Sequence, residues 1–264
     1  MVAAVLGACA SAHPSVPVAP TPAAAWAISA EGHAALALSA SAPTLPPGVI
    51  IMDDTARYPV VAATAAELAD QLGIGREAEA DSAYIGLTGT QVRWQFRPLR
   101  GDSGCRLTQI AVFLRVVTTL PQWLPPTGTP DSLTRQWLTF LGATLIHEHG
   151  HRNIALHTAV DILRTLTDVR GATCEGLDEI ANLNAHAVWD LGQRRQIQYD
   201  IATAHGVTQG SRWPPPRAPP GREPAPDAAP TSGYGAANAA AGAVPAVPSA
   251  PTATSTSRNA TTAL

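Results

Sequence analysis

The residues of this chain most able to do chemistry lie in the pentapeptide His-Glu-His-Gly-His at positions 147–151. Within it, His147, Glu148 and His151 form the pattern HExxH. On a helix, a spacing of four residues puts both imidazoles on one face, about one turn apart. Two neutral imidazole nitrogens so placed can bind one Zn²⁺, and Glu148 can reach a water molecule on the same metal. The pattern therefore predicts zinc-dependent hydrolysis with Glu148 as the general base.

A catalytic zinc usually has three protein ligands, so the pattern leaves one ligand to be found. The helix that carries the pattern can run to a stop at Arg170-Gly171, about 20 residues or roughly 30 Å further on. A second helix that starts at Glu175 and returns antiparallel regains the height of the pattern about 20 residues later. Glu175 and Glu179 would then lie at the far end of the hairpin. Three side chains lie at or just beyond the right height: Tyr199, Asp200 and His205.

His205 is the preferred third ligand, because imidazole suits zinc and Gly206 lets the backbone turn close to the site. Asp200 is the alternative ligand, or it can orient a ligand histidine. Tyr199 can donate its hydroxyl to the developing oxyanion of a tetrahedral intermediate. Each of the three also has an ordinary structural explanation at the end of a helix. His149 lies two residues from each ligand, so we expect it to point off their face.

Two long helices are expected to position these residues. The first is predicted to have Thr129 as its N-cap and Pro130 at its first helical position, and to run to about Val169. Its buried stripe is predicted to comprise Leu133, Trp137, Phe140, Leu141, Thr144 and Leu145. The second is predicted from Glu175 to about Tyr199. The apolar spacing that indicates it is that of Ile180, Leu183, Ala187 and Leu191.

A shorter helix and two strands are expected before them. Residues 64–72 begin with a capping box of Thr64 and Glu67 and have helical apolar spacing. Residues 92–96 alternate between apolar and polar side chains, which is typical of a half-buried strand. Residues 105–119 form a more apolar run that predicts a second, antiparallel strand. Together these elements predict an α+β fold, with a small antiparallel sheet packed on the long helix and its antiparallel partner.

Composition limits the classes of function. The net charge is −3, all 17 basic residues are arginine, and they form no basic stripe. A nucleic-acid partner and a polybasic membrane patch are therefore not expected. No apolar run approaches the roughly 20 residues that a transmembrane helix needs. We expect a peptide or protein substrate.

The ends of the chain differ in composition from its middle. Residues 1–20 are expected to be a lipoprotein-like or truncated signal segment, because Leu6-Gly7-Ala8-Cys9 resembles a lipobox whose cysteine becomes lipidated. Residues 21–49 are Ala/Pro-rich and predict a tether, and residues 214–264 predict a disordered tail. The folded domain is therefore expected over residues 50–213.

The cysteines favour export. If Cys9 carries lipid and anchors the protein to a membrane, Cys105 and Cys174 remain as one pair. A disulfide between them would close a loop of about 70 residues and contribute roughly 4 kcal/mol. Such a bond persists in an oxidising compartment, so we expect a secreted, periplasmic or lipid-anchored protein outside the cytoplasm. Two free buried thiols are the alternative.

Five ordered stretches resemble one bacterial family, a domain of otherwise unknown function catalogued as a predicted secreted Zn-dependent protease. They are Tyr58-Pro59-Val60, Val92-Arg93-Trp94-Gln95-Phe96, Thr119-Leu120-Pro121-Gln122-Trp123, His147-Glu148-His149-Gly150-His151 and Tyr199-Asp200-Ile201-Ala202-Thr203-Ala204-His205-Gly206. The resemblance covers about residues 55–213 and includes the closing Gln209-Gly210-Ser211-Arg212-Trp213. It implies a zincin-like α+β domain, an exported location and metallopeptidase activity.

The sequence leaves more than one function open. The leading hypothesis is an exported zinc metallopeptidase in which His147, His151 and His205 bind Zn²⁺. Glu148 would act as general base and Tyr199 would stabilise the oxyanion. One alternative is a non-catalytic envelope protein with a structural metal, and another is a zinc amidase that acts on a non-protein envelope substrate. A closed site with four protein ligands would indicate the structural metal, and three ligands facing an open cleft the catalytic one.

Overall fold

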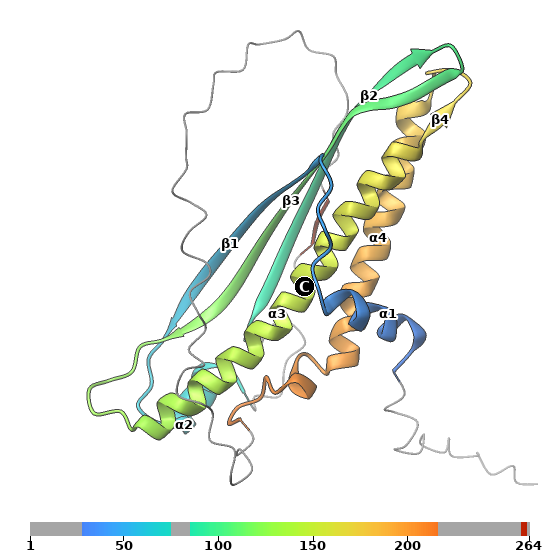
Figure 1. The fold of residues 1–264 in the computed structure, drawn as a ribbon. Helices are drawn as coiled ribbons and strands as arrows, with labels where there is room; N and C mark the ends of the chain where they lie inside the picture. Colours follow the sequence, from blue (N-terminus) through green and yellow to red (C-terminus); the bar gives the residue numbers. More distant parts are fainter. Residues whose placement is uncertain (1–27, 75–84, 216–259, 263–264) are drawn as a thin grey trace, which may run out of the picture.

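The computed structural model describes residues 28–74, 85–215 and the backbone of 260–262. The signal-like segment at 1–20, with Cys9, lies outside the described residues, as does most of the predicted tail. The described chain has α+β architecture, in which one face of a small sheet packs on a long helical hairpin (Figure 1). No helix in this part of the chain combines the length and apolarity needed to cross a bilayer.

The sheet is mixed, which corrects the expectation of an antiparallel sheet. Strand β2 (Leu87–Gly101) pairs antiparallel with β3 (Gly104–Trp123), as predicted. Strand β1 (Val49–Val60), which the sequence analysis did not anticipate, pairs parallel with the other edge of β3. Most of the β1 side chains are exposed, so the strand lacks the alternation of apolar and polar residues that would have revealed it. Two short strands complete the sheet, β4 (Arg170–Gly171) on β3 and β5 (Ala260–Thr262) on β2.

Helix α3 (Asp131–Asp168) carries the HExxH residues along the sheet, and its end matches the predicted one. Its N-cap is Pro130, one residue later than expected, because the Thr129 hydroxyl donates to the carbonyl oxygen of Pro126 and makes no helix cap. The predicted stripe faces inward: Leu133, Trp137, Phe140 and Thr144 are buried, and Leu141 and Leu145 are half-buried.

Helix α4 (Leu177–Thr203) returns antiparallel beside α3 and runs four residues further than predicted. The apolar residues whose spacing indicated this helix lie on its outer side: Ile180, Leu183 and Leu191 are exposed. Its buried face includes three small residues, Ala181, Ala185 and Gly192, beside larger ones such as Trp189 and Tyr199. A Cβ atom at Gly192 would lie 2.5 Å from the side chain of Thr158 on α3. Small residues therefore let the two helices approach closely.

The expected tether at residues 21–49 contains a helix, α1 (Ala30–Ser39), which packs on both α3 and α4. The Ser29 side chain caps it by accepting a hydrogen bond from the Gly32 amide. Ala35 is fully buried in a small cluster with Ile154 and Tyr199. An alanine-rich stretch is typical of a linker by composition, yet here its small side chains let α1 pack on α3 and α4. The predicted short helix is also present, as α2 (Ala65–Gln71) with Thr64 as its N-cap.

Two apolar clusters lie on either side of the middle of α3. One contains Trp137, Phe140 and Trp213, and the other contains Trp94, Leu114 and neighbouring residues of β2, β3, α3 and α4. Between them the buried positions of β2 become polar, at Thr88 and Thr90, and the Thr88 hydroxyl donates to Glu148 of the HExxH pattern. The polar site is thus enclosed between two apolar layers.

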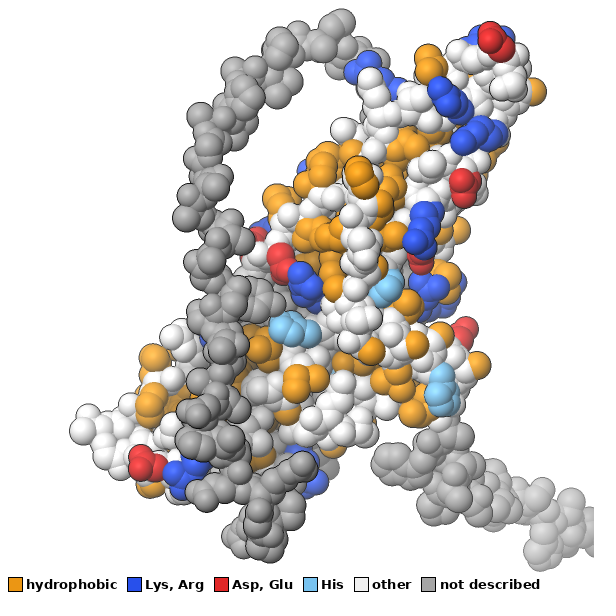
Figure 2. All heavy atoms as spheres, viewed as in Figure 1, with side chains coloured by type: hydrophobic (Ala, Val, Ile, Leu, Met, Phe, Trp, Pro, Cys, Tyr) orange, Lys and Arg blue, Asp and Glu red, His pale blue; other side chains and the backbone are white. Residues whose placement is uncertain are grey.

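The predicted disulfide between Cys105 and Cys174 is present, with a Cα–Cα distance of 5.1 Å. It joins β3 to the segment between α3 and α4 at the end of the molecule where β2, β3 and β4 meet. The bond therefore fixes the turn of the hairpin, far along α3 from the HExxH residues. Several arginine side chains gather at this same end of the molecule (Figure 2).

Candidate metal centre

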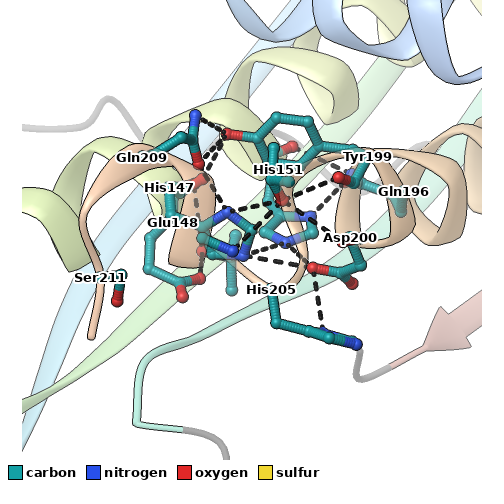
Figure 3. Close-up of polar contacts among 12 residues, drawn as sticks. His147, Glu148, His151, Gln196, Tyr199, Asp200, His205, Gln209 and Ser211 are labelled. Carbon is teal, nitrogen blue, oxygen red and sulfur yellow. Dashed lines mark hydrogen bonds and ion pairs between the residues drawn. The ribbon is translucent and has the colours of Figure 1, made fainter. Parts of the chain in front are cut away.

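Three side chains converge on one point between α3 and α4: His147, His151 and Asp200 (Figure 3). Oδ1 of Asp200 lies 3.2 Å from Nε2 of His147 and 3.0 Å from Nε2 of His151. The two Nε2 atoms are 3.2 Å apart. The four-residue spacing on α3 places both imidazoles on one face, where the rings meet edge-on, and the antiparallel return of α4 brings the carboxylate to them.

Each histidine is oriented through its other ring nitrogen by a glutamine. Oε1 of Gln209 lies 3.0 Å from Nδ1 of His147, and Oε1 of Gln196 lies 2.7 Å from Nδ1 of His151. Gln196 also donates from Nε2 to the backbone oxygen of His151, which fixes the orientation of its amide. A ring whose Nδ1–H donates to an amide oxygen keeps the lone pair on Nε2, the form that binds metals.

The group fits a metal ion both in its donors and in its spacing. Two imidazole nitrogens and a carboxylate oxygen are a ligand set that zinc accepts. With bonds near 2.0–2.1 Å, the ligand atoms of a tetrahedral zinc stand about 3.3 Å apart. The three distances of 3.0, 3.2 and 3.2 Å in this group match that spacing. The side chains of His147, His151 and Asp200 are only 7%, 5% and 14% exposed.

Of the two candidate third ligands, Asp200 lies within the group and His205 lies beside it. Nδ1 of His205 is 3.5 Å from Oδ1 of Asp200, and 68% of its side chain is exposed. His205 and Ala204 both have left-handed backbone conformations, just after α4 ends. Gly206 also has positive φ, and a Cβ there would lie 2.9 Å from the His147 ring. The expectation that Gly206 lets the backbone turn close to the site is met, while the imidazole of His205 points outward.

Glu148 lies one residue from His147 and is buried against the start of β2. The Thr88 hydroxyl donates to Oε2 of Glu148 at 2.7 Å. A Cβ at Gly86 would lie 2.6 Å from Oε1 of the same carboxylate, so the backbone there approaches Glu148 as closely as glycine permits. Burial raises the pKa of Glu148, against the lowering effects of His151 and of the Thr88 hydrogen bond. A carboxyl group with a raised pKa is better suited to take up and release a proton near neutral pH.

The charges of the group are coupled. Burial alone would raise the pKa of Asp200. In the protonated form of the site, in which Nε2 of His147 and of His151 carries a hydrogen, the hydrogen bonds from these rings and their charges hold the pKa of Asp200 well below its usual range. Burial alone would lower the pKa of His151, but the hydrogen bond and charge of Asp200 raise it overall. Asp200 is therefore ionised, which is the form that binds a cation.

Tyr199 is fully buried behind the two histidines. Its ring stacks on His147 at a centroid distance of 5.0 Å and meets His151 edge-on at 4.9 Å. Its hydroxyl donates to the backbone oxygen of His147 and accepts a hydrogen bond from Nε2 of Gln209. A Cβ at Gly150 would lie 2.1 Å from this hydroxyl, so only glycine fits there. These contacts favour a positioning role for Tyr199 over the oxyanion role suggested by the sequence.

Sequence reasoning did not single out Gln196, Gln209 or Thr88. Gln196 precedes Asp200 by one helical turn, so the signal available in the sequence was an amide on the same helix face as a candidate ligand. In the structure this side chain is buried, with 1% exposure. Gln209 lies in the short helix η2 (Val207–Gln209), after a turn whose path the sequence does not reveal. His149, as expected, is not part of the group and is half-buried.

A mixed sheet on a helical hairpin, with two histidines and an aspartate gathered between the helices, defines an α+β protein with a candidate metal centre. The family described as "Bacterial protein of unknown function (DUF922)" matches residues 55–206, more than half of the 264 residues. The chain belongs to this family. No curated protein and no solved structure matches it.

Proposed function

We propose that this chain is an exported zinc-dependent metallopeptidase. The proposal rests on the convergence of Nε2 of His147, Nε2 of His151 and Oδ1 of Asp200, which lie within 3.2 Å of one another. Glu148, the residue after His147 on the same helix, adds a base beside this group. The zincin-like description and the peptidase assignment come from the resemblance of the sequence motifs. The geometry supports them by supplying a ligand set and a base in one place.

In this proposal His147, His151 and Asp200 bind the metal, with His205 as the alternative third ligand. A bound zinc ion would lower the pKa of a coordinated water molecule and polarise the carbonyl group of a substrate. Gln209 and Gln196 hold the two imidazoles in the tautomer and orientation that present Nε2. Tyr199 supports the ring of His147 from behind.

Glu148 is the proposed general base and then the general acid. Its carboxylate takes a proton from the attacking water and passes it to the leaving amine. Thr88 fixes the position of the carboxylate through the hydrogen bond to Oε2. The apolar layers on both sides of the site limit access of bulk water to this proton.

The disulfide between Cys105 and Cys174 is consistent with a location outside the cytoplasm. Export, and an anchor through Cys9, otherwise rest on the composition and leader of the sequence. A peptide or protein is the proposed substrate.

A second candidate is a non-catalytic envelope protein in which the same residues hold a structural metal. The low exposure of the three ligand side chains favours it, because it limits the access of a substrate to the site, although three protein ligands leave the fourth position that a catalytic zinc keeps for water. A zinc amidase on a non-protein envelope substrate would use the same chemistry as a peptidase. Activity measurements must therefore include both peptide and peptidoglycan substrates.

The test compares the full chain with its Glu148→Gln variant. Both are expected to bind one zinc per chain, because Glu148 is not a proposed ligand. Each protein is incubated with a mixed peptide library and, separately, with peptidoglycan. Only the unsubstituted protein is expected to hydrolyse the peptides, detected by mass spectrometry, and cleavage of peptidoglycan alone would favour the amidase. Stoichiometric zinc with no hydrolysis of any substrate would favour the structural metal, and no zinc at all would reject the proposal.

A further inference from the structure

A cavity lies at the end of the molecule where β2, β3 and β4 meet. Its volume is about 710 Å³, which is within the range of sites for small ligands. The turn between β2 and β3 forms one wall, and β4 with the residue after it forms another. Four of the lining residues have polar or charged side chains: Asp102, Ser103, Arg106 and Arg170. The cavity therefore offers a polar site far along α3 from the candidate metal centre.

Strand pairing brings two arginines together in this cavity. Arg106 of β3 lies directly opposite Arg170 of β4. Residues directly opposite in an antiparallel pair share one face of the sheet, with Cβ atoms about 4.5–5.5 Å apart. Cys105 is buried in the core between sheet and helices, so the next side chain, Arg106, is directed to the outer face. Like charges placed in this way repel each other, and an anion between them would relieve the repulsion.

Neither arginine is neutralised by a carboxylate. In the described part of the chain the arginine ion pairs involve Arg115, Arg152, Arg164 and Arg195. Arg170 donates from Nη1 to the carbonyl oxygens of Thr167 and Val169, which orients its guanidinium group. An arginine has five N–H donors, so Arg170 keeps donors for a ligand. Asp102 also lines the cavity but forms no ion pair with either arginine.

Two further arginines add positive charge around the cavity. Arg97 lies opposite Thr108, two residues along β3 from Arg106, and therefore on the same face of the sheet. Arg100 lies opposite Cys105 and is exposed. Figure 2 shows arginine side chains gathered at this end of the molecule. Arg170 is distant from the other three in the sequence, so the cluster arises only through the pairing of β4 with β3.

The frame that carries the two arginines is rigid. A Cβ atom at Gly104, which has a φ of +121°, would lie 2.5 Å from the backbone oxygen of Gly171. Both glycines line the cavity, so its walls approach closely through their backbones. The disulfide between Cys105 and Cys174 joins the same two segments. Binding of a ligand here would need little ordering of the protein, which favours affinity.

We infer that this cavity binds a phosphate ester, whose phosphoryl oxygens accept hydrogen bonds from Arg106 and Arg170. Guanidinium groups match phosphate oxygens in both geometry and charge. The Ser103 hydroxyl can donate to the same group. The cavity is larger than a phosphate ion, so the remaining space takes the group esterified to it. The ester is either a soluble small molecule or a phospholipid headgroup. The inference does not depend on the proposed peptidase activity.

The test titrates the full chain with glycerol 3-phosphate in a calorimeter. We expect saturable binding that Arg106→Gln weakens at least ~10-fold, because the variant loses a charged hydrogen-bond donor. Arg135→Gln removes the same charge from an exposed position near the start of α3 and should leave the affinity unchanged. Asp102→Asn removes the carboxylate from the cavity and should tighten binding. The absence of saturable binding, or equal losses in the two arginine variants, would overturn the inference.

Two controls exclude other binding modes. Asp200→Asn disables the candidate metal centre, and its affinity for glycerol 3-phosphate should equal that of the unsubstituted chain. A loss of affinity in this variant would place the phosphate on the metal and overturn the inference. Glycerate carries a carboxylate in place of the phosphate ester, and equal affinity for it would reject the assignment to phosphate. Arg106→Gln should also keep its zinc stoichiometry, so the outcome is independent of the proposed function.

A vesicle assay distinguishes the two sources of the ester. The protein carries Cys9→Ser, so that no lipid anchor contributes, and is sedimented with phosphatidylglycerol vesicles. Sedimentation that is lost in Arg106→Gln and displaced by glycerol 3-phosphate would assign a lipid headgroup. Binding of glycerol 3-phosphate without sedimentation would assign a soluble ester. Sedimentation that persists in Arg106→Gln, without binding of glycerol 3-phosphate, would reject the cavity as the site.

Discussion

Oε1 of Gln209 lies 3.0 Å from Nδ1 of His147, although the two residues are 62 positions apart in the sequence. The contact depends on the turn after α4, where Gly206 packs against the same imidazole. Tyr199 donates to the backbone oxygen of His147 from a third direction. His147 is therefore held by the segment that follows α4 as well as by its own helix.

The first prediction concerns this contact. Gln209→Leu removes the acceptor for Nδ1–H of His147, and loss of such a partner typically lowers metal affinity by about 10–100-fold. We expect a loss of this size for zinc, measured by competition with a chromophoric chelator. Gln209→Glu keeps an acceptor at the same place and should retain most of the affinity. Equal losses of zinc affinity in the two variants would show that the affinity does not depend on the hydrogen bond from Nδ1 of His147.

The second prediction distinguishes the two candidate third ligands. Asp200→Asn removes the charge of the carboxylate that lies 3.0 Å from Nε2 of His151 and should abolish stoichiometric zinc binding. His205→Ala removes a side chain that is largely exposed and should keep one zinc per chain. Elemental analysis after dialysis gives the stoichiometry. The reverse pattern would restore His205 as the third ligand, as the sequence suggested.

The third prediction uses two glycines of the same helix. A Cβ at Gly150 would overlap the Tyr199 hydroxyl, so Gly150→Ala should lower the free energy of unfolding by about 1–3 kcal/mol and displace the ring behind His147. Gly142 has open space around its Cβ position, so Gly142→Ala should raise stability by about 0.5–1 kcal/mol. Denaturant unfolding of the metal-free proteins measures both. A loss of stability in both variants would mean that alanine is unfavourable in helix α3 for a reason other than the contact of Gly150 with Tyr199.

Part of the site followed from the sequence because it depends on local periodicity. HExxH on one helix fixes the faces of His147 and His151, and the length of the hairpin fixes which part of α4 lies opposite. That reasoning placed Asp200 at the right height and put Glu175 at the far end. It could not decide between Asp200 and His205, because the outcome depends on left-handed backbone conformations at residues 204–206.

Other elements were missed because their stability comes from long-range packing. Strand β1 is held by its parallel pairing with β3, and its own side chains are mostly exposed. The apolar spacing that indicated α4 was helical but lies on the outer side, because small residues such as Gly192 form the contact with α3. A pattern shows that a helix forms, but the side that packs is decided by the shape of its neighbour.

The fourth prediction concerns the disulfide, which should affect stability and not the metal centre. Cys105 and Cys174 are 69 residues apart, and a loop of that size is worth about 4 kcal/mol in the chain-entropy model. Replacing both by alanine should lower the free energy of unfolding by about this amount. Zinc affinity at a temperature where the variant is folded should remain unchanged. A loss of affinity in the folded variant would mean that the hairpin end and the metal centre are coupled.

The last prediction tests Thr88 as a residue that positions the proposed base. Thr88→Val keeps the shape of the side chain but removes the hydroxyl that donates to Oε2 of Glu148. The raised pKa of Glu148 should rise further, because the Thr88 hydrogen bond is one of the contributions that lower it. In an active enzyme kcat should fall, KM should change little, and the acidic limb of the kcat profile should move to higher pH. Thr88→Ser restores the donor and should return the profile. A role in packing alone would lower stability in the valine variant and leave the pH profile where it was.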